Sequence, residues 1–136
     1  MSEVEKPFAG RRILLVDDDR ISIGMLAAIL GNQGIETALA SSGREMMERL
    51  AESPPFDLLL LDFHLQGETG PELAAQLRRS AKFDSTPILA MTASVDPQEI
   101  EMLLASGMDA YILKPIVLKT LRPLLERWLG QGRAPA

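Results

Sequence analysis

Short apolar runs alternate with segments of helical periodicity along nearly the whole chain. The clearest run holds four consecutive leucines, 58–61, between Asp57 and Asp62. A continuous apolar run of this length is typical of a strand buried on both faces, as in parallel sheets covered by helices. Similar runs predict further strands at 11–17, 35–40, 88–91 and 110–113.

Each apolar run is followed by a segment that predicts a helix. The best defined start has Asp96 as the cap, Pro97 at the first helical position and Glu99 at the third. Pro123 is unfavourable inside the last helix, so we expect that helix to start late, near Thr120, or to be kinked. The expected helices cover 20–32, 44–51, 71–80, 97 up to Gly107, and the remainder of the chain to about residue 129.

Five strand-and-helix units joined by short loops imply right-handed crossovers and a parallel sheet with helices on both faces. We therefore predict an α/β fold of the flavodoxin-like (βα)5 type, a doubly wound five-stranded parallel sheet in the order 2-1-3-4-5. A chain of 136 residues suits a single domain. We place this domain at 11–129, between loose segments at 1–10 and 130–136.

Composition narrows the class of protein. No apolar stretch approaches the roughly 18 residues that cross a bilayer, and the acidic, polar start has no export signal, so we expect a soluble, cytoplasmic protein without a membrane partner. The net charge of −5 argues against nucleic acid as a ligand. The absence of cysteine excludes disulfides and thiolate metal sites.

The predicted sheet gathers polar residues at one edge, because the carboxyl ends of parallel strands meet there and leave a crevice for ligands. Two carboxylates about 4 Å apart would repel by roughly 4 kcal/mol at an effective dielectric of 20, so such a cluster needs positive charge. Lys114 and a divalent cation would supply it, and all-oxygen ligands favour Mg²⁺. The residues expected at this edge are Asp17, Asp18, Asp62, Thr92 and Lys114.

At these positions the sequence resembles the receiver domains of bacterial two-component response regulators, from about Arg11 to Leu129. Each motif alone is weak, but their order at the ends of the predicted strands is specific. One departure is that Leu65-Gln66 stands where the family commonly has Met-Pro, which predicts a less restrained loop. The motifs are Val16-Asp17-Asp18, Asp62 with Gly70 eight positions on, Thr92-Ala93, and Tyr111-Ile112-Leu113-Lys114-Pro115.

The resemblance implies that Asp62 accepts a phosphoryl group from a phosphohistidine donor, either a histidine kinase or a histidine phosphotransfer protein. It implies that Asp18 binds Mg²⁺ directly, that Asp17 binds it directly or through water, and that the backbone carbonyl of His64 completes the protein's ligands. Lys114 would pair with Asp62 and then with the phosphoryl group. The Lys114-Pro115 peptide bond would be cis. Such a domain is not an enzyme beyond catalysing its own phosphorylation and dephosphorylation.

A switch is also expected from the resemblance. The Thr92 hydroxyl would donate to the phosphoryl oxygens, and Tyr111 on the neighbouring strand would turn into the space that Thr92 leaves. This movement would change the surface formed by the fourth helix, the fifth strand and the fifth helix, where a downstream effector could bind.

The first helix suggests a contact for the donor. Ile21 and Ile23 are left over from its predicted sheet-facing stripe, and we expect at least one at the surface beside Asp62. They would form an apolar docking patch for the helix that carries the donor histidine. The predicted sheet-facing stripe is Ser22, Met25, Leu26 and Ile29.

Two other classes of protein remain open from the residues. A haloacid-dehalogenase-type phosphatase would use the Asp-x-Asp within 17–19, but the acidic pair expected beyond its lysine is absent after Lys114. A flavodoxin-like FMN-binding protein needs a phosphate-binding loop after the first strand, where three aspartates would repel phosphate.

Overall fold

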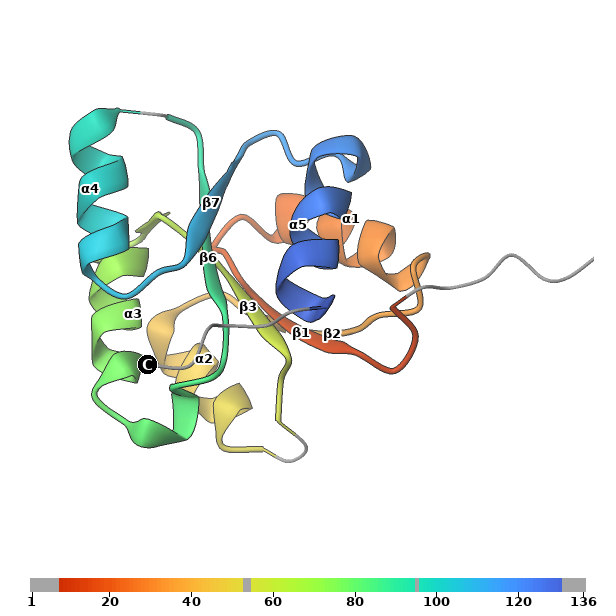
Figure 1. Cartoon of the computed structure of the whole chain (residues 1–136), viewed down its shortest axis with the longest axis horizontal. Coiled ribbons are helices and arrows are strands. Elements are labelled where there is room, and N and C mark those ends of the chain that lie inside the picture. The colour runs from red at the N-terminus through yellow and green to blue at the C-terminus, as the bar shows by residue number, and fades with distance from the viewer. Residues whose placement is uncertain (1–7, 53–54, 95, 131–136) are drawn as a thin grey trace, which may run out of the picture.

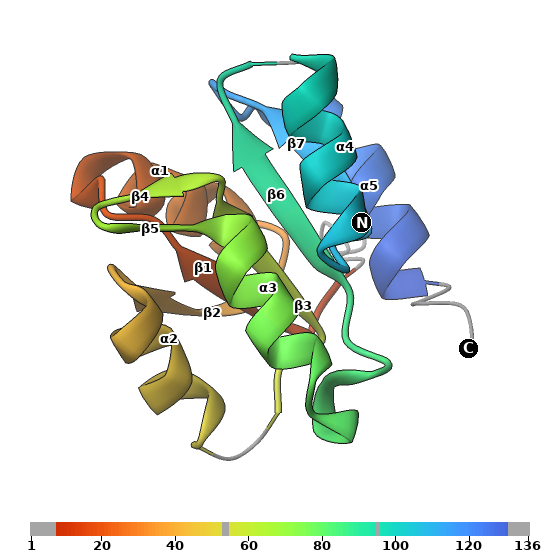
Figure 2. The same ribbon diagram turned by 90° about the vertical axis from the view of Figure 1, so that its left-hand side faces the viewer.

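A computed structural model of the chain describes residues 8–52, 55–94 and 96–130. Its centre is a parallel five-stranded sheet in the order β2-β1-β3-β6-β7, with helices on both faces (Figures 1 and 2). The predicted flavodoxin-like sheet order is thereby confirmed. The expectation of loose ends at 1–7 and 131–136 lies outside the described residues. The sheet strands are β1 (Arg12–Val16), β2 (Glu36–Ala40), β3 (Leu58–Asp62), β6 (Ile88–Thr92) and β7 (Ala110–Leu113).

The helices lie close to where the sequence predicts them, and their limits differ from the prediction by at most two residues. Asp96 caps α4 as expected, accepting a hydrogen bond of 2.9 Å from the backbone N–H of Gln98. Among the described helices none is long and apolar enough to cross a membrane. The helices are α1 (Arg20–Gly31), α2 (Gly43–Leu50), α3 (Gly70–Arg78), α4 (Pro97–Ala105) and α5 (Leu118–Gly130), with a 3₁₀ turn, η1 (Ala81–Phe83).

Two apolar cores form on the two faces of the sheet. Residues of α2, α3 and α4 pack on one face, and residues of α1 and α5 pack on the other. All five residues of β3 and all five of β6 are buried, which explains their unbroken apolar runs. Phe8 is also buried in the core of α1 and α5, although the sequence places it in a loose segment. Cover on both faces fixes the strand ends at which the polar residues lie.

The predicted inner face of α1 is wrong by about one residue. Ile23, Leu26 and Leu30 are the buried residues of this helix, whereas Met25 is 65% exposed and Ser22 is exposed. Both candidate stripes contain Leu26 and have helical spacing, so the period alone could not choose between them. The observed stripe buries three branched aliphatic side chains and leaves the Ser22 hydroxyl in water. This is more favourable than burying Ser22, because burial of apolar surface stabilises the fold.

Two further local features differ from the sequence prediction. Helix α5 starts at Leu118, so the late start near Thr120 is wrong and Pro123 lies inside the helix. The alternative, a kink in this helix, stays a prediction. The segment after Asp62 is a short antiparallel hairpin, where a plain loop was expected. The hairpin strands are β4 (His64–Leu65) and β5 (Glu68–Thr69).

Candidate functional site

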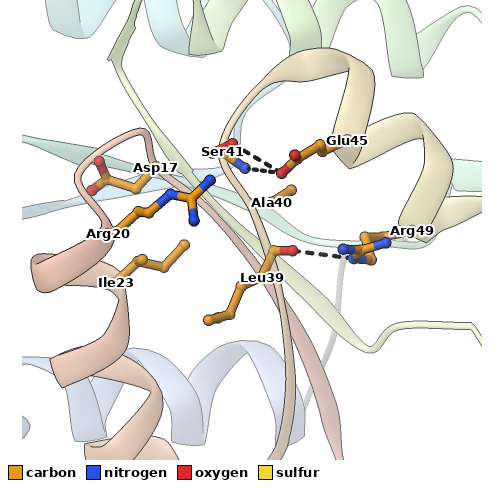
Figure 3. A pocket seen from close by; sticks show the side chains of 8 residues that line it. All are labelled: Asp17, Arg20, Ile23, Leu39, Ala40, Ser41, Glu45 and Arg49. Atoms are coloured by element: carbon orange, nitrogen blue, oxygen red, sulfur yellow. Dashed lines mark hydrogen bonds between the residues drawn. The ribbon is translucent and has the colours of Figure 1, made fainter.

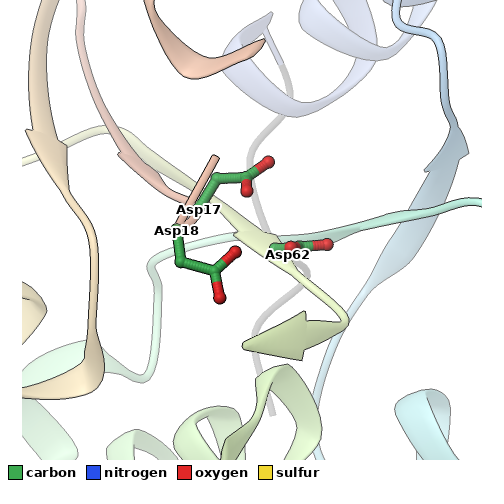
Figure 4. Close-up of side chains that lie close together, drawn as sticks. All are labelled: Asp17, Asp18 and Asp62. Carbon is green, nitrogen blue, oxygen red and sulfur yellow. The ribbon is translucent and has the colours of Figure 1, made fainter. Parts of the chain in front are cut away.

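Three carboxylates meet at the carboxyl edge of the sheet. Asp17 and Asp18 directly follow β1, and Asp62 is the last residue of the adjacent strand β3. One oxygen from each lies within 4.8 Å of the others, with Asp17 and Asp62 buried and Asp18 exposed (Figure 4). The parallel pairing of β1 with β3 produces this convergence, because it places both strand ends at one level.

Lys114 completes the cluster from the end of β7. Its Nζ lies 3.0 Å from Asp17 Oδ2 and 3.0 Å from Asp62 Oδ1. The backbone N–H of Lys114 donates to the carbonyl of Thr92 at 2.7 Å, which holds the lysine at the strand end. The Lys114-Pro115 peptide bond is cis, as the resemblance to receiver domains implied.

The electrostatics of the cluster show a shortage of positive charge. The pKa of Asp62 is raised to about 6, mainly because the carboxyl is buried; the neighbouring Asp17 adds to the rise, and the hydrogen bond from Lys114 only partly opposes it. Burial lowers the pKa of Lys114, but hydrogen bonds to Asp17 and Asp62 outweigh it and the net shift is upward. With all carboxylates ionised, the three aspartates and Lys114 together carry two net negative charges.

The donor set fits a hard divalent cation. Three carboxylates supply oxygen alone, as Mg²⁺ prefers, and a doubly charged ion matches the charge left over by Lys114. The imidazole of His64 is not part of this set, because its Nε2 lies 3.4 Å from Glu99 Oε2 on α4. The part of His64 that remains a predicted Mg²⁺ ligand is its backbone carbonyl.

The aspartates that follow β1 make different hydrogen bonds and have different roles. Asp19 caps α1, accepting from the backbone N–H of Ile21 and of Ser22 at 3.1 Å. Asp17 Oδ1 accepts from the backbone N–H of Asp19 at 2.9 Å. These bonds fix the turn into α1 and orient the Asp17 side chain between that turn and Lys114.

The hairpin of β4 and β5 packs closely under the site. Gly70 is required at its end, because a Cβ there would lie 2.6 Å from the backbone carbonyl oxygen of Asp62. Glu68 Oε2 accepts from the backbone N–H of Gly43 at 2.8 Å and so ties the hairpin to the start of α2. The spacing of Asp62 and Gly70 in the sequence is therefore a packing requirement of the site.

Thr92 and Tyr111 lie on adjacent strands but their side chains differ in surroundings. Thr92 is buried, and its Oγ1 accepts from the Ser94 N–H at 3.2 Å and donates to the Ser94 carbonyl at 3.1 Å. Tyr111 is at the surface, 36% exposed. The hydroxyl expected to bind a phosphoryl group is thus engaged with its own loop, and the tyrosine is turned outward.

The predicted docking pair is wrong for one of its two members. Ile21 is 78% exposed, but Ile23 is only 4% exposed and packs in the core of α1 and α5. The cause is the rotation of α1 that also exposes Met25, four residues after Ile21 on the same side of the helix. Ile21 and Met25 are therefore the apolar residues that α1 presents to solvent near its start.

A hollow of about 290 Å³ beside Asp17 was not predicted from the sequence. It lies between the start of α1, the end of β2 and the start of α2, and in Figure 3 the Arg20 side chain extends across it toward Ser41. Ser41 donates to Glu45 Oε1 through its N–H and its hydroxyl, and the backbone hydrogen bond is the larger cause of a lowered Glu45 pKa. No sequence motif marks this hollow, because its walls come from three separate segments.

Comparison with known proteins agrees with this geometry. The chain matches the family model of the response regulator receiver domain over residues 13–126. It is 37% identical to the DNA-binding response regulator MtrA of Mycolicibacterium paratuberculosis, over 82% of this chain and 48% of that protein. It is 30% identical to the sensor histidine kinase GacS of Pseudomonas protegens, over 95% of this chain and 14% of that protein. The chain thus spans about half the length of MtrA.

Solved structures give the same result. The receiver domain of sensor histidine kinase PA1611 from Pseudomonas aeruginosa, which has a magnesium ion coordinated in its active site cleft, is 31% identical, with a TM-score of 0.79 over 90% of this chain and 99% of that one. The chemotaxis protein CheY4 of Vibrio cholerae is 28% identical, with a TM-score of 0.82 over 88% of this chain and 98% of that one. The chain belongs to the response regulator receiver domain family.

Proposed function

We propose that this domain is a phosphoacceptor in signalling and that Asp62 receives the phosphoryl group. The observation that carries the proposal is the Asp62 carboxylate at the end of β3, paired with Lys114 at 3.0 Å and close to Asp17 and Asp18. Membership of the receiver family supports it. The phosphatase and FMN-binding alternatives are not favoured.

The donor is a phosphohistidine on a histidine kinase or a histidine phosphotransfer protein. In support, a chain in the co-crystal structure of the Saccharomyces cerevisiae histidine phosphotransfer protein Ypd1 with the receiver domain of Ssk1 is 27% identical, with a TM-score of 0.82 over 91% of this chain and 92% of that one. The phosphotransfer unit comprises residues 11–129, and the expected cytoplasmic location is part of the proposal.

In the reaction an Asp62 oxygen forms a bond to phosphorus while the bond from phosphorus to the histidine nitrogen breaks and the imidazole leaves. Phosphoryl transfer has a loose transition state that mainly needs in-line positioning and positive charge at the transferring oxygens. Lys114 supplies part of this charge and orients the Asp62 carboxylate. Asp18, Asp62 and the His64 backbone carbonyl would hold Mg²⁺, with Asp17 binding it directly or through water, and the ion when bound would supply the remaining positive charge.

The new acyl phosphate then changes the neighbouring strands. The Thr92 hydroxyl exchanges its bonds with Ser94 for a phosphoryl oxygen, since a doubly charged acceptor is stronger than a neutral carbonyl. Tyr111 turns inward and alters the surface of α4, β7 and α5, where a downstream effector binds. Support comes from exposed apolar side chains on and beside these elements, namely Met102, Leu104, Leu113 and Val117.

Incubation with acetyl phosphate and Mg²⁺ is expected to add one acid-stable, hydroxylamine-labile phosphate per chain, because a small donor needs only the site itself. Asp62→Asn should abolish uptake, and Asp18→Asn should abolish uptake or its Mg²⁺ dependence. Asp19→Asn is the control, since asparagine caps α1 equally well and should label normally. Uptake of phosphate by Asp62→Asn at the wild-type level would refute Asp62 as the acceptor.

Asp62→Asn is also expected to stabilise the metal-free protein at pH 8. The pKa of Asp62 is raised in the folded state, so ionisation of Asp62 destabilises the fold as pH rises from its ordinary pKa to about 6 and by a constant amount above that. A shift of this size corresponds to about 3 kcal/mol, which screening by solvent reduces to about 1 kcal/mol. In EDTA the variant should therefore unfold roughly 3–5 °C higher than wild type at pH 8, and much closer to it at pH 4. Mg²⁺ should narrow the difference at pH 8, and a lower Tm for the variant there would contradict the electrostatic account.

Thr92→Ala is expected to accept phosphate but to lose the response to it, because the alanine cannot bind the phosphoryl oxygens. Beryllofluoride should shift the backbone NMR signals of α4 and β7 in the wild type and in Thr92→Ser, which keeps the hydroxyl. In Thr92→Ala these shifts should fall by more than half. A full response in the alanine variant would show that Thr92 does not couple the site to that surface.

Ile21→Asp is expected to slow transfer from a phosphorylated histidine phosphotransfer protein at least tenfold, because it places a charge in the apolar contact. Labelling by acetyl phosphate should stay within twofold of wild type. Met47→Asp, which places the same charge on an exposed apolar position of α2, is the matched control and should transfer normally. Equal loss with both donors, or no loss with either, would remove Ile21 from the docking surface.

A further inference from the structure

Asp18 is the exposed carboxylate of the cluster, and its place there needs an explanation. Two other carboxylates lie within 4.8 Å of it, whereas Lys114 pairs with Asp17 and Asp62. An exposed aspartate beside like charges lowers its energy by turning into water. Asp18 remains in the cluster with its Oδ2 accepting a hydrogen bond of 2.8 Å from the backbone N–H of Gln66. A hydrogen bond to an ionised acceptor is among the stronger ones in proteins and opposes this repulsion.

The hairpin turn leaves that N–H free for Asp18. Leu65 pairs with Glu68 in the hairpin ladder, so Gln66 and Gly67 are the two central residues of the turn. Gly67 has φ of 81° and Gln66 does not have a positive φ, a pattern typical of a type II turn. The N–H of the first central residue in such a turn has no partner within the hairpin. Here it extends toward Asp18, which lies 48 residues earlier in the chain.

The hairpin that carries this N–H is fixed at both ends. Glu68 accepts from the backbone N–H of Gly43 on α2, and the N–H of Gly70 donates to the carbonyl of Phe63 at 2.8 Å. The position of the Gln66 N–H is therefore set by α2 and by the end of β3. These anchors make it a fixed donor that can hold the exposed Asp18 side chain.

We propose that the backbone amide of Gln66 is a positioning group that holds Asp18 in place for Mg²⁺ before the ion binds. This inference rests on the proposed function, because it concerns a ligand of the same site. The mechanism is preorganisation: with Asp18 already beside Asp17 and Asp62, Mg²⁺ binding does not have to gather the carboxylate from water. The residue acts through its main chain, so its side chain is free to vary.

The direct test compares Gln66→Pro with Gln66→Ala. Proline removes the N–H and suits the first central position of a type II turn, and the preceding Leu65 is in an extended strand that tolerates it. By calorimetry without any phosphodonor, the Kd for Mg²⁺ should rise about tenfold in the proline variant and stay within twofold of wild type in the alanine variant. An unchanged Kd in Gln66→Pro, or an equal rise in both variants, would overturn the proposal.

Phosphorylation kinetics separate positioning from damage. With acetyl phosphate, the Mg²⁺ concentration for half-maximal labelling of Gln66→Pro should rise about tenfold, while the rate at saturating Mg²⁺ should change less than threefold. A loss that saturating Mg²⁺ does not restore would mean a damaged site and would count against the proposal. Failure of the wild type to take up phosphate, with the Kd values as expected, would refute the proposed function and leave this inference standing.

Amide hydrogen exchange tests the same contact without proline. In metal-free protein, Asp18→Ala should speed exchange of the Gln66 amide at least tenfold, because the acceptor is gone. Asp19→Asn, which keeps Asp18, should leave that rate within twofold of wild type. Equal exchange at Gln66 in the wild type and in Asp18→Ala would show that the hydrogen bond does not hold the two groups together.

Discussion

The Lys114 ammonium between Asp17 and Asp62 is the interaction on which the site depends. It joins the ends of β1, β3 and β7 through two contacts of 3.0 Å in a partly buried place, where charge interactions are stronger than in water. One ammonium cannot balance three carboxylates. The pKa of Asp62 is raised mainly because the carboxyl is buried, and the negative charge of Asp17 adds to the rise. The free site is therefore held together but remains short of positive charge.

Because of this imbalance, the site depends on strands that are held in place by the rest of the fold. A cluster of like charges pushes its members apart, so its strands must be fixed by other forces. β3 and β6 are buried along their whole length between two apolar cores, and the ends of these strands can move little. The energy of apolar packing thus sustains a local arrangement that electrostatics alone would disperse. A divalent cation would remove the repulsion, and a phosphoryl group on Asp62 would bring in new negative charge that needs that cation and Lys114.

The sequence predicts the sheet and most of the site because both follow from strands. Apolar runs identify buried strands, parallel order brings their ends together, and Asp17, Asp18, Asp62 and Lys114 are placed by that rule alone. The inner face of α1 was not predictable, since two apolar stripes fit the helical period and only contact with the sheet selects Ile23. The direction of the Thr92 side chain was not predictable either, because it depends on the geometry of the loop at Ser94.

The backbone contact between Gln66 and Asp18 could not be predicted from the sequence, for a different reason. Every residue except proline has a backbone N–H, so the residue type at position 66 does not mark this group as a partner of Asp18. It becomes visible only when the turn at Gly67 and the anchor at Glu68 set its direction. The departure from Met-Pro at 65–66 suggested a less restrained loop, whereas the structure has a hairpin bonded to α2 and to Asp18.

A crystal structure of the protein with Mg²⁺ and beryllofluoride tests the proposed phosphorylated state of the site most directly. We expect beryllium on a carboxylate oxygen of Asp62 and Mg²⁺ bound to Asp62 and Asp18. Lys114 should lie against a fluoride, and the Thr92 hydroxyl should have moved from Ser94 to another fluoride. Beryllofluoride on another residue, or Mg²⁺ bound away from Asp18 and Asp62, would contradict the proposal.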